Sequence, residues 1–249
     1  MDQDPKMKEY EIPGTGSFKF SAISPDECDE TEYTLAVAVF DITGSVSGYE
    51  DEIRECMEKI LEGCKMSPRR DFIKLRVIVF NSYVDVQEIH GFMDVMKIDP
   101  SIYKNPHCTG GTPLFDACYS GIGSVLTYGD LLKNQDFDVN GAVYIITDGD
   151  DNDSTVTPND VKSQMVEALK GEKIESILSV LIGLNTKQCG TFLKTFKDEA
   201  ELTHYIDGGD LTPEILAKLS GFISSSISSQ SQKVGTGASA KVKPEDLNI

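Results

Sequence analysis

The stretch YTLAVAVFDITGSVS, residues 33–47, decides the fold class of this chain. Its first eight residues, Tyr33 to Phe40, are mostly apolar and favour β-structure. Short runs of this kind are typical of a central strand that is covered on both faces. The sequence turns polar at Asp41, where carboxylate and hydroxyl side chains follow in quick succession. A buried strand that ends in such a loop indicates an α/β domain with a polar site at the strand's end.

Similar strands alternate with helices along the chain on both sides of this stretch. Further strands are predicted at residues 72–80, 83–89, 142–147, 174–184 and 202–206, and helices at about 50–64, after Pro113, after Pro158, at 187–197 and after Pro213. The short Asn81-Ser82 link indicates an antiparallel hairpin. We therefore predict a doubly wound, mostly parallel six-stranded sheet with one antiparallel edge strand and helices on both faces.

Three helix starts carry capping signals. Thr157 and Thr212 each precede a proline, and Thr157 has an acid three residues on, which is the pattern of a capped first turn. Ser47 and Glu50 have capping-box spacing, so we assign Ser47 to capping.

The two ends of the chain differ from its centre. Residues 1–31 are mixed, with a Pro-Gly cluster near Ile12, and are predicted to form an N-terminal arm that lies on the domain. Residues 32–226 then make up the domain itself. Residues 227–249 are rich in Ser, Gln, Gly, Ala and Lys, and a segment that buries so little apolar surface is expected to be a flexible tail.

Charge and hydropathy limit the partners. The net charge is −18, from 41 acidic and 23 basic residues, and a field of that sign repels phosphate backbones, so we expect no nucleic-acid partner. No stretch approaches the roughly 18 uncharged apolar residues of a membrane helix, so we expect no membrane span. The patterns carry no indication of oligomeric state.

The cysteines and the N-terminus indicate a reducing compartment. Cys56 and Cys64 fall on the apolar face of one predicted helix, where free cysteine packs as a small hydrophobe. None of the six cysteines forms a CxxC pair, which argues against zinc or disulfide-exchange chemistry. The segment from Met1 to Tyr10 lacks the apolar core of a signal peptide. We therefore expect a cytoplasmic protein.

Three loops are predicted to meet at the carboxyl ends of the strands, where open parallel sheets bind their ligands. They contribute two carboxylates and three hydroxyls, from Asp41, Thr43, Ser45, Thr112 and Asp148. These are hard oxygen donors without a thiolate or an imidazole, which favours Mg²⁺, Mn²⁺ or Ca²⁺ over Zn²⁺. The alternate spacing of the first three allows one tight turn to aim all three oxygens at one point.

These motifs resemble the von Willebrand factor A (vWA) family, whose metal-ion-dependent adhesion site (MIDAS) reads D-x-S-x-S, then a distant Thr, then a distant Asp. Asp41, Thr43, Ser45, Thr112 and Asp148 occupy those positions, within a GGTP turn and a TDG loop. The resemblance covers about residues 32–225. Thr43 stands where Ser is usual. The threonine keeps the hydroxyl but adds a methyl group.

The resemblance implies a non-enzymatic, metal-dependent protein-binding module. In that family the metal accepts an Asp or Glu carboxylate from a protein partner. The chain looks like stand-alone bacterial or phage-encoded members, including those linked to stress responses, which serve as assembly or regulatory subunits. An adhesion-like receptor domain is the version that the expected compartment disfavours.

Several alternatives use the same residues. The metal site could be degenerate, with Asp41, Asp148 and Thr112 only capping helices. The acidic residues Asp150, Asp151 and Asp153 could form a solvated loop, or could attract a second cation or a basic partner surface. Residues 151–156 also resemble the nucleophile motif of haloacid-dehalogenase-type phosphatases, which makes a metal-dependent phosphohydrolase that uses residues 148–156 the enzymatic alternative. An EF-hand is excluded because Asp153 stands where that loop needs Gly. We assign no catalytic role to His107 or Cys108.

Overall fold

A computed structural model describes residues 7–242 of the chain. Its strands are β1 (Met7–Glu11), β2 (Lys19–Ile23), β3 (Glu32–Asp41), β4 (Ile73–Asn81), β5 (Asp85–Asp94), β6 (Asp138–Thr147), β7 (Ile177–Gly183) and β8 (His204–Asp207). Its helices are α1 (Glu50–Met66), α2 (Leu114–Lys133), α3 (Pro158–Leu169), α4 (Thr186–Glu199) and α5 (Pro213–Ser231).

Within residues 7–242, the strands form one eight-stranded sheet in the order β1-β2-β5-β4-β3-β6-β7-β8. Strands β4, β3, β6, β7 and β8 are parallel neighbours, so the predicted parallel α/β core is confirmed. The predicted antiparallel hairpin is also present, because β5 runs antiparallel to β4. The predictions of six strands and of an antiparallel strand at the edge were wrong, since β2 and β1 lie beyond β5.

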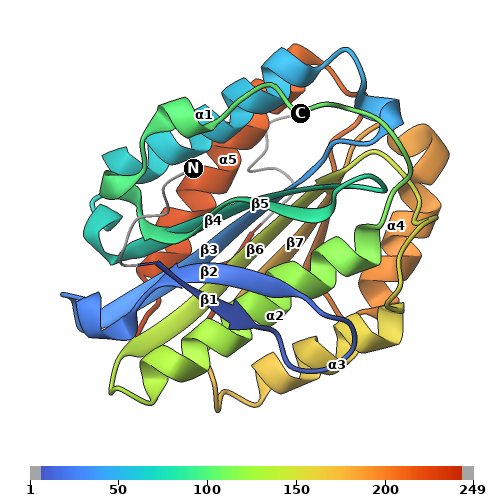
Figure 1. The fold of residues 1–249 in the computed structure, drawn as a ribbon. Coiled ribbons are helices and arrows are strands. Elements are labelled where there is room, and N and C mark those ends of the chain that lie inside the picture. Colours follow the sequence, from blue (N-terminus) through green and yellow to red (C-terminus); the bar gives the residue numbers. More distant parts are fainter. Residues whose placement is uncertain (1–6, 243–249) are drawn as a thin grey trace.

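The central strands are buried on both faces because alternate side chains enter two different cores. On β3, Ala36, Ala38 and Phe40 pack toward α1 and α5, whereas Leu35, Val37 and Val39 pack toward α2, α3 and α4. Figure 1 shows α1 and α5 together on one side of the sheet, with α2 and α3 on the other. The uninterrupted apolar run of β3 follows from this double coverage.

Two segments of the predicted N-terminal arm, β1 and β2, belong to the sheet, and residues 1–6 of the arm lie outside the described residues. Strand β1 pairs antiparallel with β2, and β2 meets β5 through the pair Ala22 and Phe92. Its apolar residues Phe20 and Ala22 are buried in the core beside α2. The boundary predicted at residue 31 therefore separates residues that share one core.

The predicted flexible tail begins inside α5, which runs to Ser231. Ile227 and Gln230 are fully buried, and Ala240 and Val242 also pack into the core. The prediction differs from the structure here because it was based on composition, which does not register polar side chains that are buried with hydrogen-bond partners. Residues 243–249 of the predicted tail lie outside the described residues.

The helix starts agree with the sequence in two of three cases. Thr157 caps α3 in a capping box with Asp160, and Thr212 caps α5 by accepting from the Ile215 amide. The assignment of Ser47 was wrong: α1 begins at Glu50 with Tyr49 in the cap position and no side-chain cap. A short 3₁₀ turn after β3, Gly44–Val46, displaces the helix start from Ser47.

The described part of the chain contains all six cysteines, and each is free. Among residues 7–242, no helix combines the length and the apolar composition that crossing a bilayer requires.

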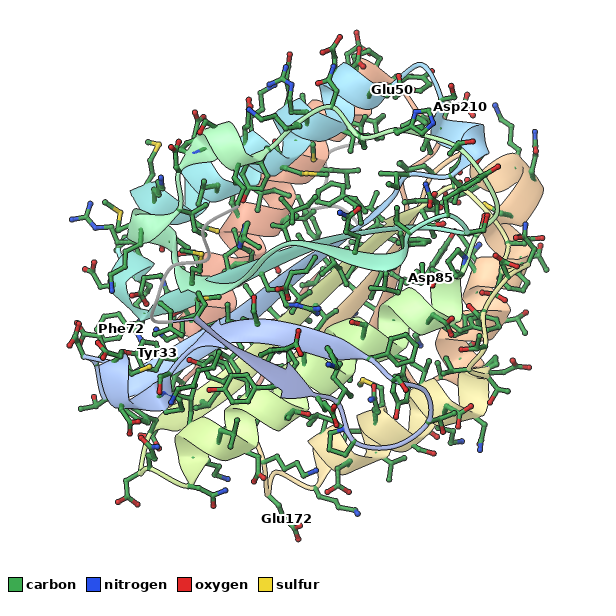
Figure 2. The ribbon with its side chains drawn as sticks, viewed as in Figure 1. Tyr33, Glu50, Phe72, Asp85, Glu172 and Asp210 are labelled. Atoms are coloured by element: carbon green, nitrogen blue, oxygen red, sulfur yellow. The ribbon has the colours of Figure 1, made fainter. Side chains whose placement is uncertain are left out.

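The carboxyl ends of the parallel strands lie at one end of the molecule. In Figure 2, the labels of Glu50, at the start of α1, and of Asp85 and Asp210 mark this end of the molecule. Tyr33, near the start of β3, and Phe72, just before β4, are labelled at the opposite end of the molecule.

Candidate metal centre

Two neighbouring parallel strands bring the two predicted carboxylates together. Asp41 is the last residue of β3, and Asp148 follows directly after β6. The register that pairs Phe40 with Ile146 places these strand ends side by side. The Thr147 hydroxyl donates to Asp41 Oδ2 at 2.6 Å, so the loops after β3 and β6 are joined at the base of the site.

The tight turn after β3 aims the first two hydroxyls at the same point. Asp41 Oδ1 accepts from the Thr43 amide at 2.8 Å, so the Asp41 carboxylate stabilises the turn that follows β3. The hydroxyl oxygens of Thr43 and Ser45 lie 2.9 Å apart. Ser45 Oγ then donates to Asp148 Oδ1 at 2.5 Å. Four of the five predicted residues therefore form one hydrogen-bonded cluster.

The GGTP turn lies against this cluster. Gly44 donates its amide to Gly110 O at 3.1 Å, and Thr109 donates to Ile42 O at 3.0 Å. Gly110 has a φ of +78°, a left-handed conformation that glycine adopts without strain. The Thr112 hydroxyl lies next to the third loop, because a Cβ built on Gly149 would be 3.3 Å from Thr112 Oγ1. The structure thus places the Thr112 hydroxyl beside the residue that follows Asp148.

The interpretation of Thr112 as a helix cap does not fit the structure. The cap position of α2 is Pro113, and no side chain of that residue caps the helix. No hydrogen bond to the Thr112 hydroxyl is found among residues 7–242, so this oxygen is available for another role.

Asn185 is a further polar residue at the candidate centre that the sequence did not predict. Asn185 Nδ2 donates to Asp148 Oδ2 at 3.0 Å, and its Oδ1 accepts from the Leu211 amide at 2.9 Å. Asn185 has a φ of +50°, which asparagine tolerates better than most residues. The available signal was its position just after β7, at the same edge of the sheet.

The centre is a concentration of buried negative charge. Asp41, Thr43, Thr112 and Asp148 are buried, whereas Ser45 is exposed and marks the side that faces solvent. Burial raises the pKa of Asp41 from 3.8 to about 6, and the Asp148 carboxylate adds to the rise, against hydrogen bonds from Thr147 and Thr43. Neither aspartate forms an ion pair with a Lys, Arg or His in the described part of the chain.

A divalent cation fits this donor set. Two buried carboxylates without a cationic partner are costly, and a dication with hard-oxygen preference would neutralise them. The described residues contain no group of three or more His, Cys, Asp or Glu side chains placed to hold a metal. The candidate centre therefore depends on its hydroxyl groups as much as on its acids.

The acidic residues beyond Asp148 have other partners. Asp151 Oδ1 accepts from the Phe115 amide at 3.2 Å and also from the Ser154 hydroxyl, so the phosphatase-like motif lies against the start of α2.

Cys108 is buried, and burial raises the pKa of its thiol to about 12, which leaves it protonated and a poor nucleophile.

Comparisons with known proteins bear on the fold. No family model matches the chain, and no curated protein does. Among solved structures, the pilus adhesin SpaC from Lactobacillus rhamnosus GG in its open conformation matches with a TM-score of 0.54 and 10% identity, over 90% of this chain and 32% of SpaC. Another crystal structure of SpaC gives 0.58 and 9%, over 90% and 33%.

The chain therefore spans about a third of the length of SpaC. The similarity supports the vWA-like fold that the motifs predict, and at this level of identity it extends to the fold alone.

Two structures of proximal thread matrix protein 1 from the mussel byssus also match, one of them with a zinc-occupied MIDAS motif. Their TM-scores are 0.47 and 0.49, with 16% and 17% identity, over 78% and 79% of this chain and 45% and 46% of theirs. Scores this low do not establish a shared fold, so the zinc site is a property of the mussel protein.

Proposed function

We propose that this chain is a divalent-metal-dependent protein-binding module and not an enzyme. Asp41, Thr43, Ser45, Thr112 and Asp148 would hold Mg²⁺, or Mn²⁺ or Ca²⁺ in its place. The observation that carries the proposal is the convergence of three loops on two buried carboxylates that no Lys, Arg or His side chain of residues 7–242 neutralises.

The partner is proposed to be a protein that supplies an Asp or Glu carboxylate. A bound dication would give such a carboxylate a positive charge and a coordination position to bind. Without the metal, the same group would meet the negative charges of Asp41 and Asp148 and be repelled. Ser45, the exposed member of the centre, marks the side on which the partner would approach.

The setting is proposed from the motif resemblance. A stand-alone module of this type would act as an assembly or regulatory subunit of a cytosolic complex, in a stress response or a related process. The six free cysteines, of which five are buried, are compatible with that compartment.

Calorimetric titration of Mg²⁺ and Mn²⁺ into the full chain tests the metal site. We expect the wild type to bind one ion and Asp41→Ala to bind none. Asp153→Ala is the matched control, because it removes an exposed carboxylate from the same end of the molecule and is expected to bind nearly as well. No binding by the wild type would contradict the proposal.

Affinity capture in Mg²⁺ and in EDTA tests the binding function. A partner that is retained in Mg²⁺ and lost both in EDTA and with Asp41→Ala would support the proposal. A partner that binds equally well in EDTA would show that recognition is independent of the metal.

A further inference from the structure

Hydrogen bonds attach the acidic loop after β6 to the residues at the start of α2. The sequence left open whether residues 150–153 are a solvated loop, and the structure shows that part of this loop is bound at two places. Asn152 joins the backbone of Thr112, and residues 151–156 join the first turn of α2. We call these contacts the clasp; its members are Asp116, Asp151, Asn152, Ser154, Thr155 and Val156.

The first half of the clasp fixes Thr112. Asn152 Oδ1 accepts from the Thr112 amide at 2.8 Å, and the Asn152 amide donates to Thr112 O at 3.1 Å. These two bonds hold the backbone of Thr112 from both sides. Gly111 makes room for them, because a Cβ at that position would lie 2.6 Å from Asn152 Oδ1.

The second half of the clasp caps α2, which lacks a side-chain cap of its own. Ser154 Oγ accepts from the amides of Phe115 and Asp116 at 3.0 and 3.2 Å. The buried Asp116 carboxylate in turn accepts from the amides of Thr155 and Val156 at 3.0 and 2.9 Å. The helix start and the loop therefore bind each other, and Thr112 lies two residues before the first residue of α2.

We propose that Asn152 is a positioning residue for the metal centre, which it serves by holding the Thr112 hydroxyl toward Asp148. This role rests on the proposed metal-binding function. Asn152 and Asp148 belong to the same loop, so the clasp sets the distance between the second and third loops of the centre. Residues that orient metal ligands contribute about 10- to 100-fold to affinity in metal sites.

The test compares two substitutions at an exposed position, so that neither disturbs the core. Asn152→Leu has a similar shape but accepts no hydrogen bond, and Asn152→Asp keeps the acceptor. Titration of Mn²⁺ into the full chain, well below the melting temperature, is expected to show affinity about tenfold lower for Asn152→Leu. Asn152→Asp and the neighbouring control Asp153→Ala should stay near the wild type.

A double-mutant cycle with Thr112→Ala shows whether Asn152 acts through Thr112. We expect Asn152→Leu to lower Mn²⁺ affinity in the wild-type background and to have little further effect once Thr112 is alanine. Gly111→Ala would place its Cβ 2.6 Å from Asn152 Oδ1. This variant should therefore lower Mn²⁺ affinity as Asn152→Leu does.

The outcomes separate the two proposals. If the wild type binds Mn²⁺ and Asn152→Leu binds equally well, or loses as much affinity in the Thr112→Ala background, the positioning role is overturned and the metal site stands. If the wild type binds no Mn²⁺ or Mg²⁺, the proposed function itself is overturned, and the role of Asn152 with it.

Discussion

At the scale of single residues, Asp41 combines two properties that seldom occur together. It is 4% exposed, and it has no cationic partner among the described residues. Its pKa rises to about 6 because burial disfavours the charged form. Near neutral pH the metal-free protein therefore holds a buried charge that a proton or a metal ion would relieve, and the two must compete.

The competition predicts opposite pH trends for metal affinity and for stability. Affinity for Mg²⁺ should fall as pH drops below about 6, because binding displaces the Asp41 proton. In EDTA the native state holds that proton up to about pH 6, whereas the unfolded chain releases it near 3.8. The Asp41 contribution to stability is therefore present at low pH and lost as pH rises through 6, by about 3 kcal/mol.

Asp41→Asn isolates this contribution in denaturant unfolding between pH 4 and 7.5. The wild type should lose stability relative to the variant as pH rises. Comparison with the variant is needed because His90, whose pKa burial lowers to about 4, contributes the opposite trend in both proteins. Parallel pH profiles for the two proteins would show that Asp41 is ionised throughout.

Thr43 offers a second test at this scale. Its side chain is 1% exposed, and its hydroxyl contacts Ser45 Oγ. Thr43→Val keeps the shape but removes the hydroxyl, and we expect Mg²⁺ affinity to fall by at least about tenfold. Thr43→Ser keeps the hydroxyl and should bind as the wild type does, at a cost of up to about 1 kcal/mol of stability for the lost methyl group. Equal affinities for Val and Thr would remove Thr43 from the centre.

At the scale of elements, the N-terminal hairpin is attached to the sheet by polar contacts. The β2–β5 pairing is a single residue pair, but Glu88 on β5 accepts from the amide and the hydroxyl of Ser21 on β2. Glu88 also forms a 2.7 Å salt bridge with Arg76, whose side chain is 1% exposed. Arg76 reaches α2 as well, where it donates to Ser124 Oγ at 3.1 Å.

Removal of one member of this pair should be costly. Glu88→Ala leaves the Arg76 guanidinium buried without its counter-charge and should reduce the free energy of unfolding by about 3–5 kcal/mol. Glu58→Ala breaks the more exposed Arg54–Glu58 pair on α1 and should have a much smaller effect, because solvent screens exposed ion pairs. Urea unfolding of both variants makes the comparison, and a similar small loss for both would mean that β2 is held by its apolar contacts instead.

The same network explains which elements the sequence predicted. Strand β3 contains the continuous apolar run from Leu35 to Phe40, so a local pattern identifies it. Strand β1 has mostly exposed or half-exposed residues, and β2 depends on Glu88, a residue more than sixty positions away. The five candidate residues could be selected from the sequence because Asp41 and Asp148 stand at strand ends, and Thr43, Ser45 and Thr112 complete the motif order of the vWA family. Asn152 was not, because its role depends on a backbone contact forty positions distant.

At the scale of the whole molecule, the C-terminal segment packs at the end of the sheet opposite to the candidate metal centre. Gln230, at the end of α5, is fully buried. Its Nε2 donates to Gly141 O at 3.2 Å, its backbone carbonyl accepts from Asn140 Nδ2 at 2.8 Å, and its Oε1 accepts from the Ala240 amide at 2.7 Å. One glutamine thus joins α5, the start of β6 and the chain beyond the helix.

Gln230 and Gln232 form a matched pair that separates stability from metal binding. Gln230→Ala leaves the Gly141 carbonyl and the Ala240 amide without these partners, which should cost about 2–3 kcal/mol. Gln232 is exposed, and its replacement by Ala should stay within about 0.5 kcal/mol of the wild type. Both variants should keep wild-type Mg²⁺ affinity below their melting temperatures, because Gly141 lies near the start of β6 and Asp148 follows its last residue. Weakened Mg²⁺ binding by Gln230→Ala would show instead that the two ends of the sheet are coupled. If Gln230→Ala were as stable as the wild type, the contacts of residues 230–242 would contribute little to stability, as expected of the flexible tail that their composition predicts.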